Sequence, residues 1–356
     1  MGKKMLACVR KTPGTLVVEE AEIPTIQART DVILKVRLCA ICGTDLHLRE
    51  LPFPDVTMGH EVVGEIVDMG EGVGDFQEGD RVVVSCTLAC GTCSSCQQGD
   101  QSACLHPEGL LQHGLLLNGC QAEYVRIPFA PFSMCKVPDA LPDDQAILAG
   151  DIFSTGMGVL ERAPLRTGDT VAVFGLGPLG LCVTAAARAL GAGLIIGVEP
   201  NAFRAETAKR MGANIVLDAG DDVVSKILDL TDGFGVDIAV EAIGKEVTLG
   251  HAFGTARIGG AITSLGVYGL DLQNLSIPVQ ARSKVPFTFY HRRFVTTLCP
   301  SGRNRLQRLM NLMQYGNLDL APLWTHTLPL KNILEGYEMA LDPKSKSIKV
   351  GVRVSG

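Results

Sequence analysis

The sequence predicts an α/β protein with two domains, one irregular and β-rich and one built on a doubly wound parallel sheet. A chain of 356 residues with 46% hydrophobic content is long enough to bury two separate cores. Short β-branched segments separated by glycine-rich turns fill the first part, up to about residue 151. From about residue 170, apolar strands alternate with helical segments, which is the pattern of a parallel sheet.

The individual elements follow from these two patterns. In the β-rich part we expect strands at residues 32–36, 62–67 and 81–84, paired mostly antiparallel. The second part predicts strands at 171–174, 194–198, 215–217, 236–241 and 261–265, with helices between them at 178–190, 204–211, 222–230 and 246–256. After residue 300 the sequence predicts an amphipathic helix at 303–313 and a short helix at 333–341.

The first turn of the predicted parallel sheet carries a dinucleotide-binding motif. In VAVFGLGPLG, Gly175, Gly177 and Gly180 form G-x-G-x-x-G between a strand and a helix. The pattern allows a tight turn, a close approach to a pyrophosphate and close packing of helix on strand, so we expect the turn residues Gly175, Gly177, Pro178, Leu179 and Gly180 to bind a cofactor.

An acidic residue after the next strand indicates which dinucleotide is bound. Glu199 follows that strand at the spacing where a carboxylate holds the adenosine ribose hydroxyls and repels a 2′-phosphate. NAD is therefore favoured over NADP, although Arg204 could contact a phosphate. The alternative is a glycine turn followed by a solvated glutamate, which the agreement of strand, turn, helix and acid disfavours.

Four cysteines lie close together in the β-rich part. Cys90, Cys93, Cys96 and Cys104 have the spacing at which a tight loop brings four thiolates to one tetrahedral Zn²⁺. Four protein ligands leave no open position, so this zinc should be structural. An iron–sulfur cluster or a redox disulfide loop is the alternative, and four unligated thiols in one loop would be prone to oxidation.

A second set of potential metal ligands is spread along the sequence. Cys42, His60 and Asp151 provide three ligands, the number that leaves a catalytic zinc one open position. Spacing alone does not establish this set, because a lone cysteine is often a core residue, a lone histidine is often structural, and an aspartate before a helix is often a cap.

These segments together resemble the zinc-dependent medium-chain alcohol dehydrogenase family. GHEVVGEIVDMG, GDRVV, the four-cysteine loop and GLGPLG occur in the family's order. The resemblance implies a catalytic zinc on Cys42, His60 and Asp151. Aspartate in place of the commoner cysteine, together with LCPSGRNRL, is similar to the bacterial secondary-alcohol branch, which often lacks the structural cysteines and prefers NADP.

The resemblance also implies roles for further residues around that zinc. Thr44 would receive the alcohol proton, His47 would pass it to solvent, Asp45 would orient His60, and Glu61 would be a neighbouring or transient ligand. Lys349 would lie near the cofactor pyrophosphate, with an exposed solubilising lysine as the alternative. Leu298 and Cys299 would line the substrate pocket and, with the 110–117 segment, form an apolar wall that suits aliphatic or cyclic secondary alcohols better than polyols.

The family's architecture assigns residues 1–155 and 298–356 to a GroES-like catalytic domain and residues 156–297 to a Rossmann dinucleotide-binding domain. The implied activity is hydride transfer between an alcohol, expected to be secondary, or its ketone and NAD, with two zinc ions per chain. The alternatives are a polyol dehydrogenase, a zinc-independent quinone reductase of the same superfamily, and a non-catalytic NAD-binding protein.

The net charge indicates which kinds of partner the protein binds, and the first residues of the sequence indicate its cellular location. The net charge of -6 gives no basic surface for nucleic acid or anionic membranes, and the first residues lack the pattern of a secretion signal. We therefore expect a cytoplasmic enzyme with a small-molecule partner. The resemblance suggests a homodimer or homotetramer, in which residues 265–279 could supply an interface strand.

Overall fold

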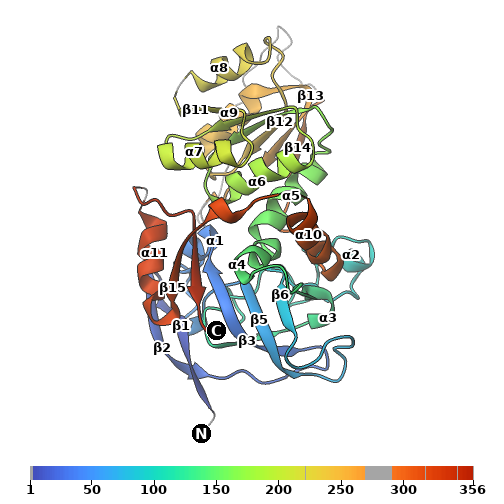
Figure 1. Cartoon of the computed structure of the whole chain (residues 1–356), viewed down its shortest axis with the longest axis vertical. Helices are drawn as coiled ribbons and strands as arrows, with labels where there is room; N and C mark the ends of the chain where they lie inside the picture. Colours follow the sequence, from blue (N-terminus) through green and yellow to red (C-terminus); the bar gives the residue numbers. More distant parts are fainter. Residues whose placement is uncertain (1–2, 221, 269–290, 317, 343, 356) are drawn as a thin grey trace. The chain divides into compact units, whose positions relative to one another are not determined.

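The computed structural model describes residues 3–220, 222–268, 291–316, 318–342 and 344–355. The chain forms two compact units (Figure 1). The first unit consists of residues 1–154, 299–317 and 324–356, and the second of residues 155–298 and 318–323. The chain thus leaves the first unit after Ser154 and returns to it at Cys299. Residues 318–323 belong to the second unit, although the family's architecture places them in the catalytic domain.

The first unit is built on a seven-stranded sheet with the order β15-β16-β3-β5-β6-β8, in which β7 also pairs with β3. Apart from the parallel pair β15 and β16, the strands pair antiparallel. The strands are β3 (Val32–Ile41), β5 (Val62–Met69), β6 (Arg81–Val84), β7 (Tyr124–Ile127), β8 (Met134–Lys136), β15 (Trp324–Pro329) and β16 (Lys349–Arg353). A three-stranded sheet is formed by β1 (Lys4–Thr12), β2 (Thr15–Glu22) and β4 (Val56–Thr57).

Four of the helices of the first unit are short, and α10 is the longest. The helices are α1 (Gly43–Leu48), α2 (Ser94–Gln97), α3 (Ala130–Ser133), α4 (Asp143–Ala146), α10 (Arg303–Tyr315) and α11 (Ile333–Leu341), and α5 (Ile152–Arg162) continues into the second unit. Residues from the end of the chain complete the main core, because Ile333, Tyr337 and Val350 pack in the same cluster as Val36 and Val62. In Figure 1, α11 (red) lies beside β2, which is drawn in blue.

The second unit contains a six-stranded parallel sheet with the order β11-β10-β9-β12-β13-β14. The strands are β9 (Thr170–Phe174), β10 (Leu194–Val198), β11 (Ile215–Leu217), β12 (Val236–Glu241), β13 (Ala256–Ser264) and β14 (Arg293–Thr296). The connecting helices are α6 (Pro178–Ala189), α7 (Ala202–Arg210), α8 (Val223–Asp229) and α9 (Glu246–Thr255). The strand order reverses beside β9, so the carboxyl ends of β9 and β12 border the crevice where such sheets bind ligands.

The predicted fold class is confirmed, and each strand and helix expected from the sequence is present. The parallel strands could be predicted from the sequence because they are buried and therefore apolar. Strand β9 is apolar along nearly its whole length, and four of its five residues are buried. The sequence did not single out β1, β2, β4, β7, β8, β15, β16 or β14; the residues of β14 are mostly exposed and carry no apolar period. The proposed interface segment 265–279 falls mainly outside the described residues. None of the helices that the structure describes is long and apolar enough to cross a membrane.

Candidate active site and metal centres

The glycine turn of the second unit has the shape that its sequence predicts. Gly175 follows β9 with φ near +89°, a conformation that favours glycine. A Cβ on Gly180 would lie 1.8 Å from the carbonyl oxygen of Gly175, so the helix can approach the turn only without a side chain there. A Cβ on Gly177 would meet no described atom within 4 Å, which leaves open space at the N-terminus of α6. Pro178 and Leu179 form the first turn of that helix.

Glu199 lies at the end of β10 and is already fixed toward this turn. Its carboxylate accepts hydrogen bonds from the backbone N–H of Leu176 at 2.8 Å and of Asn201 at 3.0 Å. Arg204 lies in the first turn of α7, and its Nε has no hydrogen-bond partner within the described chain. The two predicted nucleotide residues therefore follow the same strand, with the carboxylate held by backbone groups and the guanidinium less constrained.

The four predicted cysteines converge in one loop of the first unit. The sulfur atoms of Cys90, Cys93, Cys96 and Cys104 all lie within 4.8 Å of one another, and none forms a disulfide. Backbone N–H groups point at three of the sulfurs, as in the 3.4 Å contacts from Cys93 to Cys90 and from Leu105 to Cys93. Four sulfurs at this separation fit a closed tetrahedral zinc site.

Electrostatics within the loop differ from one thiol to the next. Burial opposes ionisation of Cys90, but hydrogen bonds from Thr92 and Cys93 outweigh it and lower its pKa to about 6. Burial raises the pKa of Cys96 to about 12. Cys90 is therefore already poised as a thiolate, whereas Cys96 would release its proton when a cation binds.

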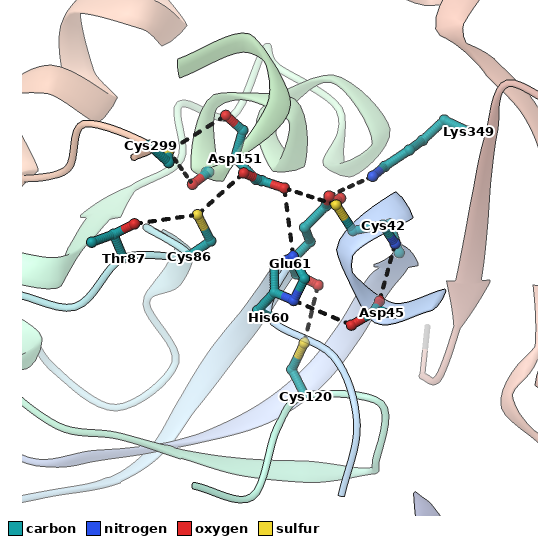
Figure 2. Close-up of polar contacts among 12 residues, drawn as sticks. Cys42, Asp45, His60, Glu61, Cys86, Thr87, Cys120, Asp151, Cys299 and Lys349 are labelled. Atoms are coloured by element: carbon teal, nitrogen blue, oxygen red, sulfur yellow. Dashed lines mark hydrogen bonds and ion pairs between the residues drawn. The ribbon is translucent and has the colours of Figure 1, made fainter. Parts of the chain in front are cut away.

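The second predicted ligand set also comes together, from three separate parts of the first unit. Cys42 is the N-cap of α1, His60 precedes β5, and Asp151 lies between a 3-10 turn and α5. Asp151 Oδ2 lies 3.4 Å from Cys42 Sγ and 3.6 Å from His60 Nε2 (Figure 2). Glu61 joins this cluster, so that one donor atom from each of the four residues lies within 4.8 Å of the others.

Two observations show that this donor set fits a metal ion. Glu61 Oε2 is buried and has no hydrogen-bond partner in the part of the chain that the structure describes. A buried carboxylate oxygen without a partner is costly unless a cation compensates it. The set also combines sulfur, imidazole and carboxylate, which are the ligand types of zinc. Cys42, His60 and Asp151 could hold the ion, and Glu61 stands close enough to join or replace one of them.

His60 is oriented by a chain of buried polar groups. Its Nδ1 lies 3.2 Å from Asp45 Oδ1, and Asp45 Oδ2 accepts hydrogen bonds from the Cys42 backbone at 3.0 Å and from Gln121 Nε2 at 3.1 Å. The Tyr337 hydroxyl in turn donates to Gln121 Oε1 at 2.8 Å. Sequence reasoning missed Gln121 and Tyr337, because nothing local distinguishes them from other core residues.

The buried charges of the cluster influence one another strongly. Burial lowers the pKa of His60, but Asp45 and Asp151 outweigh it and raise the pKa well above its ordinary value. Burial raises the pKa of Glu61 to about 7, against the opposite influence of Lys349. Burial opposes ionisation of Asp151 as well, yet His60 lowers its pKa below the ordinary value. The site therefore concentrates negative charge in a dry environment, which favours a bound cation.

Lys349 requires a correction. The exposed alternative is wrong, because only 1% of Lys349 is accessible and its ammonium forms an ion pair with Glu61. Glu61 and neighbouring anions raise the pKa of Lys349 despite its burial, so its ammonium stays protonated. A role at the cofactor pyrophosphate stays a prediction. Strand β16 alone could not show this contact, because the partner lies 288 positions away in the sequence.

The remaining predicted residues occupy different surroundings. Thr44 and His47 lie on α1 next to Cys42, and both are partly buried. Cys299 is buried beside Asp151, whose carbonyl oxygen is 3.5 Å from its sulfur. Leu298 is 43% exposed and belongs to the second unit. The 110–117 segment is not uniformly apolar, because it contains Gln112 and buried His113. Its Leu116 is 60% exposed.

A doubly wound nucleotide unit, joined to a unit with one closed and one open metal cluster, defines a class of metal-dependent dehydrogenases. The sequence models of two families agree with this class. "Alcohol dehydrogenase GroES-like domain" matches residues 28–139, and "Zinc-binding dehydrogenase" matches residues 178–314.

Relatives along the whole chain support the same class. An alcohol dehydrogenase of Cupriavidus necator is 35% identical over 99% of this chain and 100% of its own, and a sorbitol dehydrogenase of Bacillus subtilis is 31% identical over 98% and 97%. The solved structure of the alcohol dehydrogenase TADH from Thermus sp. ATN1 matches with a TM-score of 0.86 and 34% identity, covering 98% of this chain and 100% of that one. The chain therefore belongs to the zinc-dependent medium-chain dehydrogenase family, in its alcohol dehydrogenase type.

Proposed function

We propose that this protein is a zinc- and NAD-dependent alcohol dehydrogenase that interconverts a secondary alcohol and its ketone. The observation that carries the proposal is the buried cluster of Cys42, His60 and Asp151, with Thr44 and His47 on the helix that begins at Cys42. When bound, zinc supplies a Lewis acid that lowers the pKa of the alcohol, and the nicotinamide accepts the hydride.

The chain's own residues would hold and move the proton of the alcohol. Thr44 and His47 are three positions apart on α1, so their side chains lie on one helix face. The Thr44 hydroxyl would accept a proton from the substrate oxygen while it gives up its own, and the partly buried His47 would pass that proton toward solvent. Asp45 keeps His60 in one orientation, and the anions Cys42 and Asp151 would offset the charge of the zinc.

The preference for NAD rests on Glu199. Its carboxylate is held at the turn by Leu176 and Asn201, where it would accept hydrogen bonds from ribose hydroxyls and repel a 2′-phosphate. Arg204 is the residue that would favour NADP instead. We expect kcat/KM to be at least about tenfold higher with NAD than with NADP, a difference of roughly 1.4 kcal/mol. Glu199→Ala should remove the preference, and a wild-type preference for NADP would contradict the assignment.

Metal analysis tests the two zinc sites separately. Plasma mass spectrometry of the purified protein should give about two zinc ions per chain. Cys42→Ser should lose one ion and nearly all activity, whereas Cys93→Ser should lose one ion and mainly stability. Full activity in the Cys42→Ser variant would refute the proposed mechanism.

A substrate panel separates the proposed activity from its nearest alternatives. The Bacillus relative is a sorbitol dehydrogenase, so polyols belong in the panel beside aliphatic and cyclic secondary alcohols. Nicotinamide reduction should be fastest with the secondary alcohols. Faster turnover of polyols would favour the polyol alternative, and no turnover with any alcohol would favour a non-catalytic NAD-binding protein.

A further inference from the structure

A second group of potential ligands shares Asp151 with the cluster described above. Donor atoms of Cys86, Asp151 and Cys299 all lie within 4.8 Å of one another. Cys86 was not singled out in the sequence, where it is a lone cysteine after an apolar strand. Its sulfur lies 3.2 Å from Asp151 Oδ1. The other carboxylate oxygen, Oδ2, faces Cys42 and His60, so Figure 2 shows Asp151 between two different donor sets.

The two thiols are held in a buried, polar-lined position. Cys86 and Cys299 are only 2% and 4% exposed, and neither is in a disulfide. The Thr87 hydroxyl oxygen lies 3.7 Å from Cys86 Sγ. Cys299 Sγ lies 3.5 Å from the carbonyl oxygens of both Asp151 and Pro300. Oxygen atoms therefore line the thiol pair, which distinguishes it from cysteines that merely fill an apolar core.

We propose that Cys86, Cys299 and Asp151 form a third, weaker metal site, which is filled when a thiophilic divalent cation such as Zn²⁺ or Cd²⁺ is supplied in excess, and that Asp151 bridges this cation to the one held by Cys42 and His60. Two sulfurs and a carboxylate oxygen match the ligand preference of these ions. A carboxylate has two oxygen atoms and can bind a different cation with each of them. A cysteine at position 151 would offer one sulfur atom and could not reach both positions in this way.

Charge balance supports occupation of both positions at once. Two dications close together repel each other unless anions lie between and around them. With both cysteine thiols of the new site ionised, six anionic groups would face two dications and the Lys349 ammonium, and they are Cys42, Asp45, Glu61, Cys86, Asp151 and Cys299. The formal charges then nearly cancel with His60 neutral, leaving one net negative charge. Binding at the third site would release the protons of its two thiols.

The site has a functional consequence that can be measured beside metal content. A cation on Asp151 Oδ1 draws electron density from the carboxylate that also serves the catalytic position. We therefore expect Cd²⁺ at low excess over protein to inhibit the zinc-loaded enzyme at least about tenfold, a change of roughly 1.4 kcal/mol in the barrier.

The decisive experiment counts metal in the full-length, zinc-loaded protein after Cd²⁺ is added and the unbound ion is removed. The sum of zinc and cadmium should be about three ions per chain in the wild type and about two in Cys86→Ser and Cys299→Ser. Cys135→Ser is the matched control, because Cys135 is a buried thiol of the same unit that contacts Gln307. The control should keep the third ion. A wild-type total of two, or a third ion that survives both serine substitutions, overturns the proposal.

A second measurement needs no variant and stays valid if a serine variant misfolds. Cadmium nuclear magnetic resonance of the fully substituted wild-type protein should give about three signals, one of them from an all-sulfur site and one from a site with two sulfurs. Two signals would overturn the proposal.

Discussion

The buried ion pair of Lys349 and Glu61 ties strand β16 to the metal cluster. Both side chains are 1% exposed, so neither charge is compensated by water. Removal of one partner from such a pair is much more costly than removal of both.

Lys349→Met should therefore lower the free energy of unfolding by about 3–5 kcal/mol, because it leaves the Glu61 carboxylate buried without its cation. The double variant Glu61→Gln with Lys349→Met should recover more than half of this loss. Urea unfolding of the wild type, both single variants and the double variant measures the coupling. Equal losses in Lys349→Met and the double variant would show that the charge pair is not the cause.

A single buried histidine predicts the acid sensitivity of the first unit. His113 is 3% exposed, and its Nε2 lies 3.0 Å from the Arg126 carbonyl oxygen. Burial and the charge of Arg126 lower its pKa from 6.5 to about 4. Because the unfolded chain takes up a proton that the folded chain refuses, stability is lost as the pH falls from about 6.5 toward 4.

Between pH 7 and pH 5 this one group should cost the wild type about 2 kcal/mol of unfolding free energy. His113→Gln retains a donor for the Arg126 carbonyl but has no titrating group. Loss of zinc at acid pH affects both proteins, so the difference between the wild type and His113→Gln is the quantity to measure by denaturant unfolding. The same pH slope in both proteins would mean that His113 does not cause the effect.

At the scale of elements, the turn between β9 and α6 contains one glycine that the fold requires and another that cofactor binding is predicted to require. A Cβ on Gly180 overlaps the Gly175 carbonyl, whereas a Cβ on Gly177 meets only open space. Gly180→Ala should destabilise the protein by at least about 2 kcal/mol through this overlap.

Gly177→Ala should leave the free energy of unfolding within about 1 kcal/mol of the wild type, because φ near -67° suits alanine. Gly177→Ala should nevertheless weaken the binding of NAD at least about tenfold, or roughly 1.4 kcal/mol, because the methyl group enters the space predicted for the pyrophosphate. Fluorescence titration with NADH and thermal unfolding of both variants test the pair. If Gly177→Ala bound NADH as tightly as the wild type, the prediction that the glycine turn binds the cofactor would be wrong.

The elements also show what the sequence could and could not predict. The parallel strands and helix α11 were predictable, because continuous apolar strands and helical periodicity are local signals. Cys42, His60 and Asp151 were recognised through the family resemblance and not through spacing. The burial of Lys349 and the approach of Cys86 to Asp151 depend on contacts between distant segments, and no local pattern encodes such contacts.

At the scale of the whole molecule, the metal clusters and the nucleotide turn lie in different units. All the ligand groups found among the described residues belong to the first unit, and the glycine turn belongs to the second. Each unit also has its own hydrophobic core. Ligands of the two kinds should therefore stabilise different parts of the chain.

Calorimetric unfolding should reveal this division. A chelator should lower the melting temperature of the first unit by at least about 5 °C and leave that of the second unit nearly unchanged. Saturating NAD should raise the melting temperature of the second unit only. Limited proteolysis during heating assigns each transition to its unit. A single transition that shifts equally with chelator and NAD would show that the two units unfold together.

The position of β16 in the first sheet has a consequence for how the protein is made. This strand lies between β15 and β3, and it carries the lysine that neutralises Glu61. A ribosome synthesises residues 349–353 only after residues 155–298, which form most of the nucleotide unit, have been made. Until then, β3 presents an open edge and Glu61 has no counter-ion. The nascent β-rich unit is thus a candidate client for chaperones, which the finished nucleotide unit would not need.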